Sequence, residues 1–161
     1  MIQTSSTLLQ RCGRAEYATL ISHSIGATLL ARTMHKDFDA WNVKKKETDA
    51  RTDAPFCHTR ELWWCSLGVN VGAEQDGSGS DYRRPVLILK GLSITTSLII
   101  PLTTSSRRHP LRPSVGKVDG KDACALLSQM RVIDTKRLVR KIGYLDKRTF
   151  RDIRNAAKGM L

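Results

Sequence analysis

The fold is decided by the stretch Arg83-Arg84-Pro85-Val86-Leu87-Ile88-Leu89 and by the apolar run that follows it, Ile94 to Leu102. Each run has the length and the aliphatic content of a buried strand. We expect the first of these two runs to form a strand over residues 85–90. Pro85 is at its first position, where a missing N–H is tolerated. Because so few residues separate the two runs, the strands are predicted to pair antiparallel.

Further short strands are predicted on both sides of this pair. They are residues 60–69, 115–118, 123–127 and 140–145. Asp119-Gly120 lies between two of them and is a hairpin turn signal. Residues 131–138 are expected to hold a turn or a single helical turn. Many short antiparallel strands without crossover helices are typical of a small, strongly curved barrel, so the sequence argues against a Rossmann or P-loop enzyme.

A helix is predicted at the C-terminal end, over residues 146–160. Asp146 is a suitable N-cap, and Phe150, Ile153 and Ala157 share one apolar face at helical spacing. Such a helix covers one face of a sheet with its apolar side. The element order therefore predicts a mainly β fold with helices, in the α+β class.

The region before the first strand divides into two parts. Residues 1–33 are rich in Ser and Thr, so we expect a weakly ordered extension, with Met34 as an alternative start. Residues 34–57 are expected to form an N-terminal helix and a linker, and residues 58–161 the barrel domain. In that helix Asp37 lies in the first turn, and an apolar stripe is predicted from three residues. They are Phe38, Trp41 and Val43.

The chain carries a formal net charge of +12, from 27 Lys and Arg against 15 Asp and Glu. Such an excess suits a partner that carries phosphates, RNA or DNA, or a carboxylate-rich peptide, better than a small acidic substrate. The basic residues become denser toward the C-terminus, from Arg131 to Lys158. A solvated basic helix explains this density as well as a polyanion footprint does.

Four cysteines, Cys12, Cys57, Cys65 and Cys124, are scattered without a Cys-x-x-Cys pair, which fits a reducing cytoplasm. Cys57, His58 and Cys65 are three candidate metal ligands without a partnered fourth, so no metal site is expected. Cys65 and Cys124 are expected to be small buried hydrophobic residues. No apolar run approaches the roughly 20 residues that span a bilayer.

Several short pieces occur in an order and spacing that resemble the PemK/MazF family of toxin ribonucleases over residues 60–161. The pieces are Gly72-Ala73-Glu74-Gln75-Asp76-Gly77, Arg84 to Leu89, Ile100-Pro101-Leu102-Thr103-Thr104, Leu127 to Leu138 and Lys141 to Leu145. The resemblance implies an SH3-like barrel, two-fold homodimerisation, and cleavage of single-stranded RNA without a metal or other cofactor. It also implies a 2′,3′-cyclic phosphate and a 5′-hydroxyl as products, and a small acidic antitoxin as partner.

The resemblance assigns catalysis to Arg84 and Thr103, and binding or activity to Glu74. A guanidinium with forked donors grips two phosphate oxygens and stabilises charge in the transition state, but it is a poor base. Residues expected to contact RNA are Gln75, Arg83, Thr104, Arg107, Arg108 and Arg131. Candidates for the base are Glu74, ranked first, and then Asp81, His58 and His109.

Alternatives to these roles remain open. Arg84 could pair with an acid at a strand end, and Thr103 could be an ordinary strand hydroxyl. Trp63 and Trp64 point to opposite faces of their strand, so one is expected in the core. The other is expected to cover the N-terminal helix or a dimer seam, or to stack on an unpaired base. The alternative function is a non-catalytic nucleic-acid-binding or gyrase-targeting protein of the same barrel fold.

Overall fold

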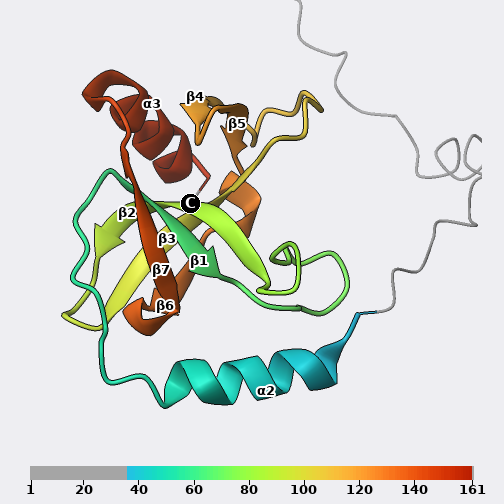
Figure 1. Ribbon diagram of the computed structural model, residues 1–161. Coiled ribbons are helices and arrows are strands. Elements are labelled where there is room, and N and C mark those ends of the chain that lie inside the picture. The colour runs from blue at the N-terminus through green and yellow to red at the C-terminus, as the bar shows by residue number, and fades with distance from the viewer. Residues whose placement is uncertain (1–35, 161) are drawn as a thin grey trace, which may run out of the picture. The chain divides into compact units, whose positions relative to one another are not determined.

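The computed structural model describes residues 36–160 and contains seven strands and two α-helices (Figure 1). The strands are β1 (Glu61–Ser66), β2 (Arg83–Gly91), β3 (Thr96–Thr103), β4 (Ser114–Val118), β5 (Lys121–Ala125), β6 (Arg131–Asp134) and β7 (Leu138–Tyr144). The helices are α2 (Phe38–Asp49) and α3 (Lys147–Lys158), with 3-10 turns over Leu127–Gln129 and Thr135–Arg137. The extension predicted over residues 1–33, with its alternative start, lies outside the described residues.

The strands form one curled antiparallel sheet in the order β4-β5-β3-β2-β1-β7, with β6 pairing β3 beside this path. The strands β2 and β3 pair antiparallel through Val86 and Pro101, as their short connection predicts. The β4–β5 hairpin turns at Asp119 and Gly120, which both have positive φ. The mainly β, α+β fold with a C-terminal helix is therefore confirmed.

Both faces of the central strands are buried, which explains why β2 is apolar at four consecutive positions. Leu87 and Leu89 belong to a core that Phe150 and Ile153 of α3 complete. Val86 and Ile88, on the other face, pack in a second core. In Figure 1 α3 and the β4–β5 hairpin lie at the top of the sheet. As predicted, Asp146 caps α3, and its carboxylate accepts from the Thr149 N–H at 2.9 Å.

Two elements differ from the expectations. The helical turn predicted within 131–138 is present as the 3-10 turn Thr135–Arg137, but the strand β6 that precedes it and pairs with β3 was not predicted. Pro85 is the third residue of β2 and not the first, because the strand begins at Arg83. No helix among residues 36–160 is both long and apolar enough to cross a membrane.

Helix α2 begins after Asp37, whose carboxylate accepts from the Ala40 N–H at 2.8 Å. Trp41 is its buried anchor, whereas Phe38 and Val43 are 48% and 60% exposed, so the predicted three-residue stripe is wrong. A single tryptophan suffices because its ring reaches two neighbours: it lies edge-on to Tyr82, 5.4 Å between centroids, and under the Arg137 guanidinium at 5.6 Å. Trp41 is thus the apolar anchor of the helix, and Lys136 Nζ adds a hydrogen bond to the Asp49 carbonyl at the other end of α2.

The Trp41 ring closes on the backbone of Gly68. A Cβ built on Gly68 would lie 2.1 Å from Trp41 Cε2, and Gly68 has φ of +86°. Both the close approach and the left-handed backbone require glycine here.

We expect Gly68→Ala to lower the free energy of unfolding by about 2–3 kcal/mol, from backbone strain plus overpacking against Trp41. Gly120→Ala is the matched control, because Gly120 has φ of +80° and open space around its Cα. The control should lose only the strain, about 1 kcal/mol. Urea denaturation measures both values. Equal losses in the two variants would show that the Trp41 contact contributes nothing.

Candidate functional site

A cavity of about 250 Å³ opens where β2 begins and β3 ends. It is lined by Trp64, Ser78, Arg83, Arg84, Pro85, Leu102, Thr103, Thr104, Val118, Asp119, Lys121 and Ala123. Arg84 and Thr103 therefore lie on one cavity, although they are 19 positions apart in the chain. The pairing of β2 with β3 brings them together.

Arg84 is held by three neutral oxygens, two from the β1–β2 loop and one from β3. Its Nε donates to the Asp76 carbonyl at 2.6 Å, one Nη donates to the Leu102 carbonyl at 3.0 Å, and the other reaches Ser78 Oγ at 3.4 Å. A guanidinium has five N–H groups, so two of them are left for a ligand. These contacts fix the orientation of the side chain before any ligand binds.

Within residues 36–160, Arg84 makes no ion pair with a carboxylate within 4.0 Å. Burial lowers the pKa of its guanidinium, and the nearby charge of Asp76 opposes this shift. The alternative in which Arg84 only pairs with an acid is therefore disfavoured. A half-buried cation without a carboxylate partner attracts an anion strongly, because few counter-charges compete for it.

The opposite wall of the cavity comes from Trp64 and from the β4–β5 hairpin. Trp64 Nε1 donates to Asp119 Oδ2 at 3.3 Å, and Arg140 approaches the same carboxylate oxygen at 3.5 Å. Lys121 adds a further cation to the lining. Of the two adjacent tryptophans, Trp63 lies in the core, as expected for one of the pair. The other lies in the cavity wall, which suits stacking on a planar ring.

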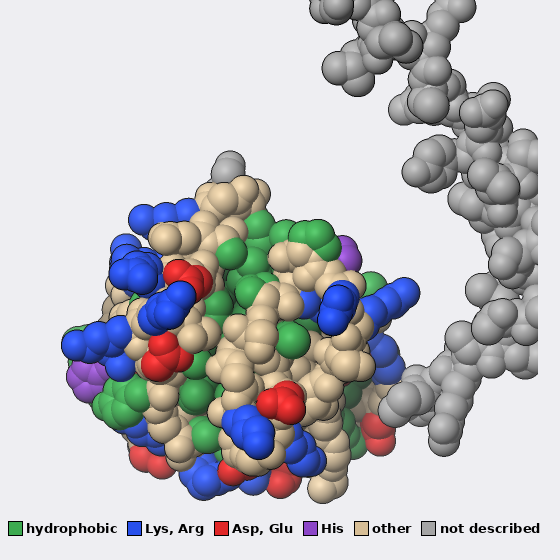
Figure 2. Space-filling model, turned by 90° about the horizontal axis from the view of Figure 1, so that it is seen from above, with side chains coloured by type: hydrophobic (Ala, Val, Ile, Leu, Met, Phe, Trp, Pro, Cys, Tyr) green, Lys and Arg blue, Asp and Glu red, His purple; other side chains and the backbone are tan. Residues whose placement is uncertain are grey.

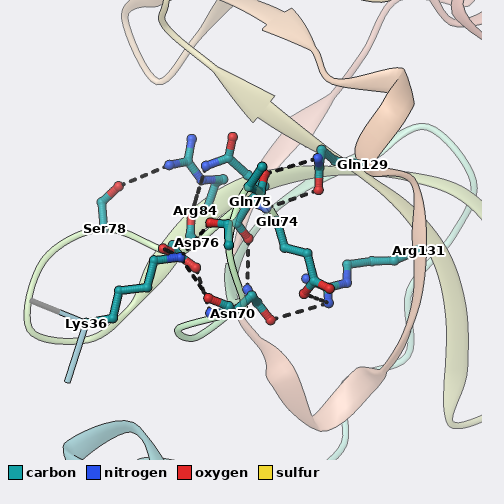
Figure 3. A network of polar contacts seen from close by, with 11 residues as sticks. Lys36, Asn70, Glu74, Gln75, Asp76, Ser78, Arg84, Gln129 and Arg131 are labelled. Atoms are coloured by element: carbon teal, nitrogen blue, oxygen red, sulfur yellow. Dashed lines mark hydrogen bonds and ion pairs between the residues drawn. The ribbon is translucent and has the colours of Figure 1, made fainter. Parts of the chain in front are cut away.

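The loop between β1 and β2 carries a polar network that ends at Arg84 (Figure 3). The Asp76 carboxylate accepts from the Asn70 N–H at 2.6 Å and pairs with Lys36 Nζ at 2.9 Å. Asn70 Nδ2 donates to the Gln75 carbonyl at 2.9 Å. The loop is thereby folded back on itself beside the cavity.

Glu74 and Gln75 belong to the same loop, but neither residue lines the cavity. The Glu74 carboxylate is 3.8 Å from Arg131, whose guanidinium also reaches Asn70 Oδ1 at 3.4 Å. The Gln75 N–H donates to Gln129 Oε1 at 3.0 Å. Glu74 thus pairs with Arg131, and Gln75 bonds to Gln129 (Figure 3). None of these residues lines the Arg84 cavity.

The other predicted RNA contacts divide between the cavity and the following loop. Arg83 and Thr104 line the cavity, and Arg83 also approaches Asp81 at 3.3 Å. Arg107 and Arg108 are exposed in the segment that connects β3 to β4. Viewed from the side of α3 and β4–β5, lysine and arginine side chains are spread around the rim of the domain (Figure 2).

The proposed bases occupy different places. His58 Nδ1 lies 3.3 Å from Glu61, and His109 Nδ1 accepts from the Leu111 N–H at 3.1 Å; neither residue lines the cavity. Asp119 does line the cavity, although the sequence pattern predicts only a turn at this residue. The signal was present in Asp119-Gly120, because a hairpin turn presents an aspartate to its surroundings.

The cysteines near this site differ in burial. Cys65 is directly opposite Arg84 in the β1–β2 register, and it is fully buried, whereas Cys124 is only partly buried, contrary to its predicted burial. Burial raises the pKa of the Cys65 thiol to about 12. Among residues 36–160, no group of three or more His, Cys, Asp or Glu side chains is arranged to hold a metal ion.

Comparison with known proteins identifies what this arrangement resembles. The family model described as "PemK-like, MazF-like toxin of type II toxin-antitoxin system" matches residues 58–161. Among solved structures, the chain is similar to MazF from Deinococcus radiodurans, crystal form I, at 18% identity and a TM-score of 0.55. That similarity covers 66% of this chain and 96% of the other.

A second similar structure is the MazE-MazF complex from Deinococcus radiodurans, crystal form II. It is 14% identical, with a TM-score of 0.52, and the match covers 66% of this chain and 95% of the other. At these identities the two structures support the fold and not the chemistry. The family match begins at residue 58, so α2 lies outside it.

Proposed function

Since the chain belongs to the family of PemK-like, MazF-like toxins of type II toxin-antitoxin systems, we propose that it is an endoribonuclease that cleaves single-stranded RNA. The observation that carries the proposal is Arg84, a half-buried cation held by neutral oxygens on the same cavity as Thr103. We assign residues 58–161 to the nuclease domain and residues 34–57 to a helical extension. The reaction proposed is attack of the 2′-hydroxyl on the adjacent phosphate, without a metal or other cofactor.

In this reaction Arg84 binds two oxygens of the scissile phosphate and neutralises the charge that grows on them in the transition state. Thr103 donates its hydroxyl to the same phosphate. The attack breaks the bond to the 5′ oxygen, which leaves with a proton and gives a 2′,3′-cyclic phosphate and a 5′-hydroxyl. Asp119 is the acidic residue on the cavity wall and is placed best to take the 2′-hydroxyl proton.

The rest of the site would bind the RNA chain. The ring of Trp64 offers a stacking surface beside the phosphate, and stacking tolerates any base. Arg83, Thr104, Arg107 and Arg108 provide donors and charge for neighbouring phosphates, as the sequence predicts. Glu74, Gln75 and Arg131 form a second polar group, which we assign to binding of a nucleotide farther along the strand.

We further propose a small acidic antitoxin and a homodimer as the partners. One similar solved structure is a MazE-MazF complex, which supports a protein partner for this chain. The net charge of +12 favours an acidic segment of that partner lying over the cavity. Such a segment would compete with RNA for Arg84. The fit to a reducing cytoplasm rests on the cysteine pattern.

The proposed function predicts that the purified full-length protein cuts unstructured RNA in the presence of EDTA. The products should carry a 2′,3′-cyclic phosphate, which mass spectrometry of the digest distinguishes from a linear phosphate. Loss of cleavage in EDTA would contradict the metal-independent reaction. Tight binding of RNA without any cleavage would support the non-catalytic nucleic-acid-binding protein instead.

A further inference from the structure

We propose that Lys36, which precedes α2, is a positioning residue for Arg84: it captures the carboxylate of Asp76 so that Arg84 meets only the Asp76 carbonyl and keeps its charge for the substrate. The inference deepens the proposed function and rests on it. Lys36 and α2 lie outside residues 58–161, the part that the toxin family model matches. The extension would therefore be part of the catalytic apparatus of this chain.

Lys36 uses its ammonium group on three acceptors of the β1–β2 loop. Its Nζ donates to the Asn70 carbonyl at 2.7 Å and to the Gly72 carbonyl at 3.0 Å, and pairs with Asp76 Oδ2 at 2.9 Å. An ammonium has three donors, so this side chain is fully engaged. The side chains of Lys36 and Asp76 are 28% and 29% exposed, so the pair is partly shielded from solvent.

Asp76 connects the lysine to the arginine. Its side chain is occupied by Lys36 and by the Asn70 N–H, whereas its carbonyl accepts from Arg84 Nε at 2.6 Å. Both contacts belong to one residue, so a shift of the carboxylate also moves the carbonyl that orients the guanidinium. Figure 3 shows Asp76 between Lys36 and Arg84.

The negative charge of Asp76 acts on the Arg84 guanidinium. Asp76 is close enough to Arg84 to oppose the lowering of the arginine pKa. Without Lys36, that carboxylate would be an uncompensated anion beside the cation that should bind phosphate, and it would compete with the substrate. With Lys36 in place, the lysine charge balances the Asp76 carboxylate, and the charge of Arg84 remains for the ligand.

Trp41 explains why Lys36 has a defined position. Its ring packs against Gly68 and Tyr82, which lie at the two ends of the same loop. The Tyr82 carbonyl in turn accepts from the N–H groups of Leu67 and Gly68. Helix α2 is therefore fixed to the base of the loop, and Lys36, at its N-terminal end, reaches the tip.

The activity test compares Lys36→Gln with the double variant Lys36→Gln/Asp76→Asn in the full-length protein. We expect Lys36→Gln to lower the single-turnover cleavage rate at least about tenfold, the scale of one hydrogen bond to a charged group. The double variant should recover most of this loss, because it removes the competing carboxylate but keeps the carbonyl. Lys44→Gln on α2, where Lys44 pairs only with exposed Glu47 among the described residues, is the control and should cleave normally.

The structural test does not need RNA cleavage. The test uses NMR spectra of ¹⁵N-arginine-labelled protein, in which the Nε–H signal of Arg84 is assigned by its loss in Arg84→Lys. We expect the Nε proton of Arg84 to exchange slowly with solvent in the wild type. Lys36→Gln should speed this exchange about tenfold or more by weakening the contact to the Asp76 carbonyl. If wild type does not cut RNA but this exchange responds, the proposed function fails and the positioning role stands.

Two results would overturn the inference. One is unchanged cleavage and unchanged Nε–H exchange in Lys36→Gln. The other is a double variant that is as slow as Lys36→Gln with equal thermal stability, because a lysine that only props up the loop would not be rescued by removing the Asp76 charge.

Discussion

Replacement of Arg84 by alanine should lower the rate of RNA cleavage by about a hundredfold or more, on the scale of losing one preorganised partner of transition-state charge. The structure explains why the effect should be large. Arg84 is oriented by the carbonyls of Asp76 and Leu102 and still has donors left for the phosphate. Single-turnover cleavage of a short labelled RNA measures the effect.

Two further variants separate chemistry from folding in this experiment. Arg84→Lys keeps the charge but loses the forked donors, so it should also be slow while remaining folded. Lys90→Ala removes another cation of β2, at its exposed far end, and should cleave like wild type. Full activity of Arg84→Ala would rule out the proposed role of the cavity, whatever its stability.

The second large effect concerns stability and Glu61, which is only 1% exposed. Its carboxylate accepts from Lys141 Nζ at 2.5 Å, from Trp63 Nε1 at 2.7 Å and from the His58 N–H at 3.0 Å. Burial alone would raise the pKa of Glu61, but the hydrogen bonds from these groups and from Tyr144 outweigh it and lower the pKa to about 2. The ionised form therefore stabilises the fold.

Glu61→Gln should lower the free energy of unfolding by about 3 kcal/mol at pH 7, because it leaves Lys141 without its buried partner. The folded-state pKa is depressed, so this contribution is present above the unfolded value near 4.5 and is lost as pH falls toward 2. Urea denaturation of both proteins from pH 7 to pH 2 should thus show two curves that converge in acid.

Glu47→Gln is the control for this experiment, because Glu47 is an exposed acid paired with Lys44 on α2. It should change stability by less than about 1 kcal/mol at every pH. A difference between wild type and Glu61→Gln that stays constant from pH 7 to pH 2 would contradict the assignment to the charge of Glu61.

Much of the fold could be predicted because its signals are local. The short connection between β2 and β3, the Asp119-Gly120 turn and the apolar face of α3 each specify structure within a few residues. Strand β6 was missed because it is short and mostly polar or exposed, and it forms only because β3 offers a free edge. Its pairing is long-range, and periodicity does not report such pairing.

The sequence predicted those residues of the candidate site that the family resemblance names. It did not predict the residues that distant segments of the chain bring to the cavity. The sequence places Arg84 and Thr103 on adjacent strands, and the structure puts both on one cavity. The cavity walls that come from Asp119 and Lys121 depend on how the β4–β5 hairpin pairs with the end of β3. The contact of Lys36 with Asp76 spans 40 positions, and no local pattern announces it.

Cys65 gives the site one further property. Its thiol lies beside Arg84 on the neighbouring strand, yet it is sealed from solvent and its pKa is about 12, so the reactive thiolate is essentially absent at any physiological pH. Peroxide and alkylating reagents attack thiolates, so Cys65 is protected from both reagents by its burial. An alkylating reagent added to the folded protein should therefore leave Cys65 unmodified, although this cysteine lies opposite Arg84 in the strand pairing.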